Sequence, residues 1–437
     1  MNKKKGARFL TTLVIFSLTG QIAWVVENMY FNVFVYQMFG ANPSQISAMV
    51  SASAVAATLT TLLIGALSDR LGKRKAFICG GYILWGISIF SFALIRTETL
   101  AAIIPATASA AAVCITLVIV LDCVMTFFGS SANDACFNAW LTDMTASGGR
   151  GAAEGINAMM PLVAILAVFG GFMSFDLTQS TSWTVIFIVI GAVVLLVGVL
   201  GLFLIDEPTM QTAENKNVFA NIVYGFRLSV VRKNPLLYLS LAVFAVFGIS
   251  IQIFMPYLIL YYTEALKMEG YVFIMAPAIV LAAVFTAIWG RVYDRIGFCR
   301  AVVPSMALLA VGYVVLYFTR TTVPVFLGSL LMMCGYLSGM AVFGAVIRDY
   351  TPENRAGMFQ GLRIVGQVLI PGVIGPAIGA AILKNAEVVV GNDGMEAFIP
   401  NVNIFLGALI VLAPLCLLLG VLFSAMKRRE VSDERDN

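Results

Sequence analysis

The chain has 437 residues, of which 60% are apolar and only 11% are charged, and its mean hydropathy is +0.94. Soluble domains carry about a quarter charged residues, so this composition excludes a soluble globular protein and predicts a membrane protein with many spans. The net charge of +4 therefore reflects membrane topology and does not indicate a nucleic-acid partner.

Apolar segments separated by clusters of charged residues predict twelve membrane-spanning helices. We expect them at residues 9–38, 45–68, 76–96, 115–141, 155–176, 182–205, 236–262, 271–290, 301–319, 323–347, 357–383 and 402–426. The stretch 97–112 contains Pro105 and is apolar but too long for a simple turn. We interpret it as an outer extension of the third or the fourth helix.

Lys and Arg residues gather on the side of the N-terminus, in the loops between alternate spans and in the tail Lys427-Arg428-Arg429. The cations outside this set are Arg96, Lys267, Arg320 and Lys384 at the opposite side, and Arg363 inside a span. By the positive-inside rule, both termini are expected to be cytoplasmic, in the cell (inner) membrane.

The longest polar stretch inside the chain is 206–234, which we interpret as a cytoplasmic linker. It separates an N-terminal six-helix bundle at 1–205 from a C-terminal six-helix bundle with a short cytoplasmic tail at 235–437. The middle of the linker, 218–231, is amphipathic and is expected to lie on the membrane surface as a short helix.

One loop sequence occurs twice, after the second and after the eighth span, at a constant offset of 225 residues. The matching positions are Gly65 and Gly290, Asp69 and Asp294, Arg70 and Arg295, and Gly72 and Gly297, followed by cations that include Arg74 and Arg300. Glycine allows close helix approach, Asp and Arg pair or cap helix ends, and the cations keep the loop in the cytoplasm. The chain is therefore two copies of one membrane half, with gating loops.

A second repeat follows the fourth and the tenth spans. Asp143 and Arg150 in the first half correspond to Asp349 and Arg355 in the second half, and in both halves a glycine lies twelve residues after the aspartate. We assign these residues to the gate as well.

The seven cysteines show no metal-ligand spacing, and we interpret them as packing residues. The chain has no histidine and no phosphate-binding loop of the form G-x-x-x-x-G-K-[ST]. A His-based triad is therefore impossible and ATP hydrolysis is not supported. We expect no enzyme activity, no metal and no cofactor.

The twelve spans, the paired D-R-x-G loops and the cytoplasmic termini resemble the major facilitator superfamily. Glu27 in the first-span sequence Gly20-Gln-Ile-Ala-Trp-Val-Val-Glu27-Asn28, with Asp143 to Arg150, resembles sucrose/proton symporters and the glycoside-pentoside-hexuronide:cation symporters, which include melibiose permease. The resemblance implies an all-α membrane protein of two pseudo-symmetric six-helix bundles that transports by alternating access. The second span departs from the cation pattern of that group, because it has no carboxylate before Asp69.

Charges inside the hydrocarbon are costly, so we expect the chemistry at the few polar residues within the spans. Gln21, Asn28 and Asn32 share one face of the first span at helical period, with Trp24 beside them. These groups either bond neighbouring helices or form a cavity face that binds the hydroxyls and the apolar face of a sugar. The other candidate substrate-binding residues are Asn133, Asn138, Asn157, Gln252, Tyr257 and Gln367.

Glu27 and Asp122 lie at a similar depth in the outer half of the membrane. Removal from water disfavours the charged form of a carboxyl group, so Glu27 is our first candidate for the coupling proton site, followed by Asp122 and Asp134. Asp134 and Arg363 also share a depth and are expected to pair. That pair is either a fixed salt bridge or a switch in which a proton, a cation or the substrate competes for Asp134.

These observations predict a monomeric secondary transporter, surrounded by membrane lipid, that takes up a small sugar or glycoside with a proton or a sodium ion. Sodium would use the same oxygens together with Asn28. The alternatives are a proton-coupled drug or metabolite exporter, a lysolipid transporter and a transport-inactive membrane sensor. The amides beside the carboxylates argue against an exporter with an apolar cavity, and the retained intramembrane charges argue against a sensor.

Overall fold

The computed structural model describes residues 3–102, 109–145, 150–207, 225–268, 270–351, 361–390 and 396–436. Among these described residues, twelve helices are long and apolar enough to span a membrane, as the sequence predicts. The chain divides into two compact units: Met1–Ala220 with Val389–Ala397, and Asn221–Val388 with Phe398–Asn437.

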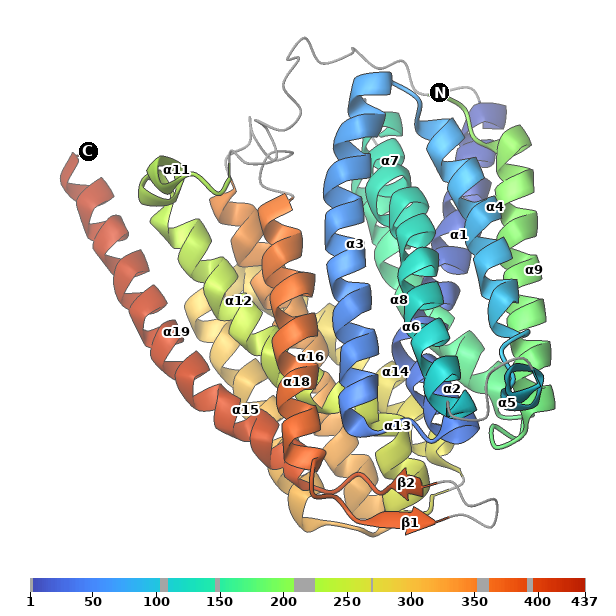
Figure 1. The fold of residues 1–437 in the computed structure, drawn as a ribbon. Coiled ribbons are helices and arrows are strands. Elements are labelled where there is room, and N and C mark those ends of the chain that lie inside the picture. The colour runs from blue at the N-terminus through green and yellow to red at the C-terminus, as the bar shows by residue number, and fades with distance from the viewer. Residues whose placement is uncertain are drawn as a thin grey trace. The chain divides into compact units, whose positions relative to one another are not determined.

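The first unit contains the first six spans (Figure 1). Its elements are α1 (Lys3–Val25), the π-helical segment η1 (Val26–Tyr30), α2 (Phe31–Phe39), α3 (Pro43–Leu71), α4 (Arg74–Phe92), α5 (Thr97–Ala101), α6 (Ala110–Gly129), the π-helical segment η2 (Ser130–Phe137), α7 (Asn138–Met144), α8 (Arg150–Phe172) and α9 (Ser180–Leu204). The first span runs through α1, η1 and α2, and the fourth through α6, η2 and α7.

Local sequence signals set the turns between these helices. Asn42 caps α3 in a reciprocal capping box with Gln45, and Pro43 occupies the first turn, where its missing N–H costs nothing. Gly72 ends α3 with φ 62°, a left-handed conformation that favours glycine, so the repeated loop turns at this residue.

The second unit contains the other six spans. Its helical elements are α11 (Leu228–Lys233), α12 (Pro235–Phe254), the 3-10 turn η3 (Met255–Tyr257), α13 (Leu258–Leu260), the π-helical segment η4 (Tyr261–Ala265), α14 (Tyr271–Ile296), α15 (Phe298–Phe318), α16 (Thr322–Tyr350), the π-helical segment η6 (Val365–Leu369), α18 (Ile370–Leu383) and α19 (Asn403–Asp436). The strands β1 (Val388–Val390) and β2 (Glu396–Phe398) pair as a two-stranded sheet between α18 and α19.

The two units pack their helices in the same pattern. In the first unit α1 contacts α8, α3 contacts α6, and α4 contacts α9. In the second unit the corresponding pairs are α12 with α18, α14 with α16, and α15 with α19. The internal sequence repeat therefore corresponds to a repeated bundle, and the expected pseudo-symmetric six-helix architecture is confirmed.

Two local details differ from expectation, and a third expectation lies mostly outside the described residues. Of the stretch 97–112, α5 is a separate short helix, the segment from Ala110 belongs to α6, and 103–108 lie outside the described residues. The strands β1 and β2 were not predicted. Of the amphipathic segment 218–231, only 225–231 lies within the described residues, and α11 begins there at Leu228.

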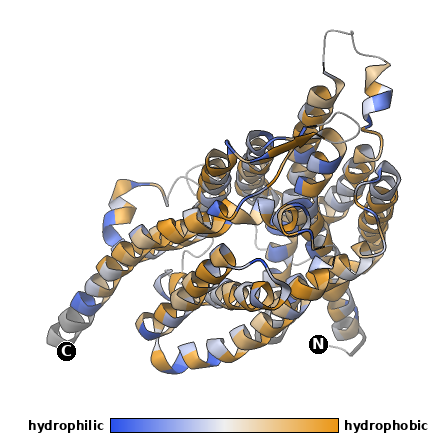
Figure 2. Ribbon diagram, turned by 90° about the horizontal axis from the view of Figure 1, so that it is seen from below, coloured by the Kyte–Doolittle hydropathy of each residue, from blue (hydrophilic) through white to orange (hydrophobic). Residues whose placement is uncertain are grey.

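Hydrophobic residues predominate along the long helices (Figure 2). Phe203 on α9 and Leu417 on α19 are 73% and 75% exposed. Such large exposed apolar surfaces are unsuited to water and match the hydrocarbon of a bilayer. The protein is therefore an integral membrane protein.

The close approach of α15 and α16 gives a stability prediction. A Cβ atom at Gly335 would overlap the backbone of Leu309, whereas a Cβ atom at Gly344 on the same helix meets no described atom within 4 Å. We expect Gly335→Ala to destabilise the protein by about 1–3 kcal/mol, the usual cost of overpacking. Thermal unfolding in detergent checks this, with Gly344→Ala as the matched control. Equal Tm values for the two variants would contradict it.

Candidate functional site

Among the described residues, four spans contain a π-helical segment, and three of these segments carry predicted site residues. Glu27 and Asn28 lie in η1, Asn133 and Asp134 in η2, and Gln367 in η6. The fourth segment, η4, carries Tyr261 and Tyr262. A π-helical turn holds an extra residue, which shifts the side-chain register, and such turns are frequent at functional sites.

Glu27 is buried between three helices and is 6% exposed. Its Oε1 atom accepts hydrogen bonds from Ser53 Oγ of α3 at 2.6 Å and from Thr126 Oγ1 of α6 at 2.8 Å. The two hydroxyl oxygens are 2.9 Å apart. Its other oxygen, Oε2, is buried and has no hydrogen-bond partner among the described residues. Within the described part of the chain, only one oxygen of this carboxyl group is thus hydrogen-bonded.

Asp122 is 2% exposed and lies one helical turn before Thr126 on α6. Because Thr126 contacts Glu27, Asp122 lies on the face of α6 that packs against Glu27. Its Oδ1 atom is buried without a hydrogen-bond partner in the described part of the chain. The structure therefore brings together the two carboxyl groups that the sequence places at one depth.

Asp134 lies in a separate polar network in η2. Ser130 Oγ donates to its Oδ2 at 3.0 Å and Asn133 Nδ2 donates to its Oδ1 at 3.1 Å. The Tyr82 hydroxyl of α4 lies 3.0 Å from Asn133 Oδ1 and 2.8 Å from the carbonyl oxygen of Phe16. Asp134 is partly exposed, whereas Asn133 is buried.

Aromatic rings lie beside this network. Trp24 of α1 and Trp85 of α4 have ring centroids 5.0 Å apart, and the indole of Trp24 lies near the carboxyl group of Asp134. A Cβ atom at Gly129 would overlap both rings, so the absence of a side chain there makes room for them. Carboxylate, amide, hydroxyl and indole groups thus converge between α1, α4 and η2.

The remaining candidates on the first unit have different environments. Gln21 is half-buried and Asn28 is exposed, but Asn32 is 1% exposed and donates to the carbonyl oxygen of Asn28 at 3.1 Å. The expected common face is therefore interrupted, because η1 shifts the helical register between Gln21 and Asn32. Asn138 is exposed, and Asn157 of α8 accepts a hydrogen bond from Ser17 of α1.

In the second unit, Arg363 is half-buried and donates to Gln367 Oε1 at 3.3 Å. Within this unit, no carboxylate of the described residues pairs with it. Gln252 lies where α12 and α18 approach closely at Gly375. Tyr257 is completely buried.

Arg74 holds together the helix ends around the first repeated loop. Its guanidinium group is 4% exposed, pairs with Asp69 of α3 and hydrogen-bonds to Ser68, and its Nε lies 3.2 Å from Asp143 Oδ2 of α7. The sequence assigned Arg74 to the gate, and the structure shows that this residue, rather than the adjacent Arg70, contacts Asp69. The side chain of Arg150 lies outside the described part.

The second repeated loop is held differently. At the position of Arg74 the second loop has Cys299, and at the position of Ser68 it has Tyr293. The Tyr293 hydroxyl donates directly to Asp349 Oδ2 at 3.0 Å. In the first unit, the ends of α3 and α7 are thus joined by an ion pair through Arg74. In the second unit, a neutral donor joins the corresponding ends of α14 and α16. A Cβ atom added at Gly290 would meet no described atom within 4 Å. Gly297 turns the chain with φ 74°. Arg355 lies outside the described residues.

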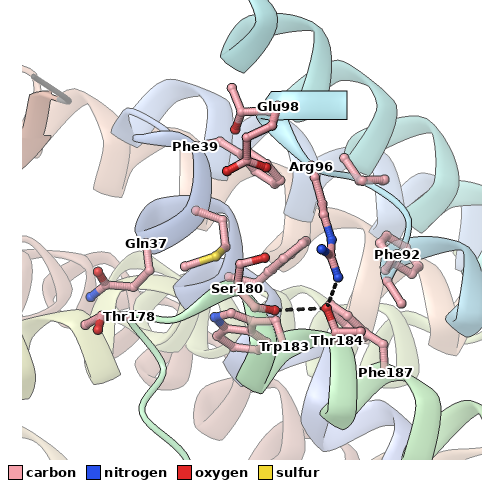
Figure 3. Close-up of a pocket in the computed structure, with 15 residues that line it drawn as sticks. Gln37, Phe39, Phe92, Arg96, Glu98, Thr178, Ser180, Trp183, Thr184 and Phe187 are labelled. Carbon is pink, nitrogen blue, oxygen red and sulfur yellow. Dashed lines mark hydrogen bonds between the residues drawn. The ribbon is translucent and has the colours of Figure 1, made fainter. Parts of the chain in front are cut away.

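A separate cavity of about 390 Å³ lies at the end of the first unit opposite the N-terminus (Figure 3). Phe34, Phe92, Trp183 and Phe187 line it, and Arg96 donates to Thr184 Oγ1 at 3.0 Å. None of the predicted substrate-binding residues lines this cavity. We therefore place the candidate site at Glu27 and Asp134.

The sequence matches the family model described as Major Facilitator Superfamily over residues 9–287 and 273–437. The chain belongs to the major facilitator superfamily. No curated protein matches the sequence.

Solved structures of similar fold are transporters. The nucleoside transporter NupG is 13% identical, with a TM-score of 0.70, over 95% of this chain and 98% of that chain. A bacterial homolog of the human lysosomal transporter Spinster, inward-facing and occupied, is 14% identical, with a TM-score of 0.71, over 98% of both chains. The xylose transporter XylE from E. coli is 12% identical, with a TM-score of 0.68, over 95% of this chain and 98% of that chain. These identities show a shared superfamily fold only.

The structure adds polar and aromatic residues that the sequence analysis did not single out: Ser53, Tyr82, Trp85, Thr126 and Ser130. The isolated hydroxyls of Ser53 and Thr126 are common in spans and give no distinctive pattern. Ser130 is four residues before Asp134, and this helical spacing was a usable signal.

The Arg74 cluster allows a test of the gating role predicted for the first repeated loop. We expect Asp69→Asn to slow turnover more than it weakens substrate binding, because Asp69 belongs to the helix-end ion cluster and has no contact with the Glu27 site. Asp176→Asn, at an exposed loop carboxylate, is the matched control. Transport rate and direct binding are measured on the same preparation. An equal loss of affinity and rate would refute the gating role.

Proposed function

We propose that this superfamily member takes up a small sugar or glycoside together with a proton, by alternating access. The observation that carries the proposal is the combination, in one unit, of a buried carboxyl group with a nearby polar and aromatic surface. Glu27 supplies the group that can change charge, and Asn133, Asp134 and Trp24 supply groups that can bind a polyhydroxyl solute. Secondary transport needs both elements to be coupled.

The chemistry around Asp134 suits a sugar ring. Carboxylate and amide oxygens accept hydrogen bonds from hydroxyl groups, and amide N–H groups donate to them. The indole pair of Trp24 and Trp85 offers an apolar surface for the C–H face of the ring. The similarity of Glu27 and its surrounding sequence to sucrose/proton symporters supports the same class of substrate. Among the similar folds, NupG and XylE are named for nucleosides and xylose, which both contain a sugar ring.

The geometry around Glu27 favours a proton over sodium. Glu27 Oε1, Ser53 Oγ and Thr126 Oγ1 lie within 2.6–2.9 Å of one another. A bound cation would have to push these three oxygens apart, because ligands around one ion repel each other. A proton binds without that rearrangement.

Two other functions are compatible with the superfamily. Export in place of uptake uses the same coupling site with the opposite direction of flux. Lysolipid transport is the second alternative. We favour uptake of a sugar because the candidate residues around Asp134 are amides, hydroxyls and indoles rather than aliphatic side chains. In this proposal both termini and both repeated loops are cytoplasmic, and the loops form the gate.

Replacement of Glu27 tests the coupling. Glu27→Gln imitates the protonated carboxyl permanently, so we expect substrate to bind and to exchange across the membrane. Accumulation against a gradient should disappear, because the empty carrier can no longer release a proton. Counterflow and pH-driven uptake are measured in proteoliposomes, with Glu98→Gln as the exposed carboxyl control. A Glu27→Gln protein that still concentrates substrate in response to a pH gradient would move the proton site to another carboxyl.

The proposed pairing of Asp134 with Arg363 remains a prediction from sequence, since the two residues belong to different units. We expect Asp134→Asn and Arg363→Gln each to impair transport and the double variant to be less damaging than the sum, with a coupling of roughly 0.5–3 kcal/mol. The uptake rates of the unmodified protein, the two single variants and the double variant complete the double-mutant cycle. Strict additivity would exclude the pair.

A further inference from the structure

We infer that Ser53 and Thr126 are positioning residues that make Glu27, and not the neighbouring Asp122, the carboxyl group that releases the transported proton. Asp122 keeps its proton throughout the cycle. This inference rests on the proposed proton coupling and names the residues that select the proton carrier within that site.

The two carboxyl groups have unequal hydrogen-bond environments. Two hydroxyl groups from two different helices donate to Glu27, at 2.6 and 2.8 Å. No described side chain donates to Asp122, whose Oδ1 is buried without a partner. Hydrogen bonds from neutral donors stabilise a carboxylate more than a carboxylic acid. Ser53 and Thr126 therefore favour ionised Glu27, and nothing comparable favours ionised Asp122.

The charges around Glu27 and Asp122 allow only one of these two carboxyl groups to be ionised at a time. The facing groups are Ser53 from α3, Thr126, Asp122 and Cys123 from α6, and Asp134 from η2, of which the two aspartates are acidic. No Lys or Arg pairs with Glu27 or Asp122 among the described residues. Two adjacent buried carboxylates without a cation would repel each other in a medium that solvates neither.

The proton balance of the step is simple. In one state both groups are carboxylic acids and the pair is neutral. In the other state Glu27 has given one proton to water and carries a single negative charge, which its two oxygens share and which the two hydroxyl groups stabilise at Oε1. Asp122 remains a carboxylic acid in both states. The site thus carries one proton per cycle although it contains two carboxyl groups.

The test is an infrared titration of purified protein, which follows the C=O band of protonated carboxyl groups with pH and needs no transport. We expect Glu27→Gln to abolish the titrating band and Asp122→Asn to preserve it. Thr126→Val should move proton release to higher pH by about one to two pH units, because the carboxylate loses one donor worth about 1.5–3 kcal/mol. Thr126→Ser, which keeps the hydroxyl group, should restore the original pH.

Ser53→Ala tests the same role from a different helix and should shift release in the same direction. The inference is overturned if Asp122→Asn abolishes the titrating band, or if Thr126→Val and Thr126→Ser titrate at the same pH. The measurements distinguish a failure of the proposed proton-coupled function from a failure of the positioning roles of Ser53 and Thr126. A shifted Glu27 titration in a protein without proton-driven flux would remove the proposed function and leave the roles of Ser53 and Thr126 standing, whereas flux without these shifts would remove only those roles.

Discussion

The hydrocarbon core of the bilayer provides no water for polar groups, and this constraint governs the whole structure. Many hydroxyl groups within the described spans donate to a carbonyl oxygen one turn earlier, as Thr58 does to Ala54 and Ser338 to Cys334. Nine buried side-chain atoms of the described residues lack a hydrogen-bond partner, and the two carboxyl oxygens among them belong to Glu27 and Asp122. An unsatisfied buried polar atom is costly, so a group whose charge changes during function is a physical reason for such atoms to persist.

The π-helical segments are irregularities that coincide with polar side chains on helices that are otherwise apolar. Asn133 and Asp134 lie three and four residues after Ser130, so the three residues would share one face of a regular α-helix as well. Within η2, both Ser130 and Asn133 donate to Asp134. The same irregularity at η1 presents Glu27 to α3 and α6 while Asn28 remains exposed.

The two units share their packing but not their charges. Equivalent helix pairs contact each other in both, yet the carboxyl groups of the candidate site lie only in the first unit, and Arg363 lies in the second. The repeated loops diverge in the same way, with Arg74 bridging two carboxylates in one and Tyr293 contacting Asp349 in the other. The two units thus share the apolar contacts that build a bundle, whereas their polar positions differ.

The sequence by itself determined the twelve spans, the two bundles and the superfamily, because hydropathy, glycine loops and a constant repeat offset are local or periodic signals. It also identified Glu27, Asp122 and Asp134, since any carboxyl group inside a span is conspicuous. Tertiary structure alone decided what surrounds them. Ser53, Thr126 and Trp85 come from three different helices, and their hydroxyl and indole groups are ordinary in membrane spans. The interruption of the face from Gln21 to Asn32 had the same origin, because a π-helical turn depends on packing and leaves no periodic trace in the sequence.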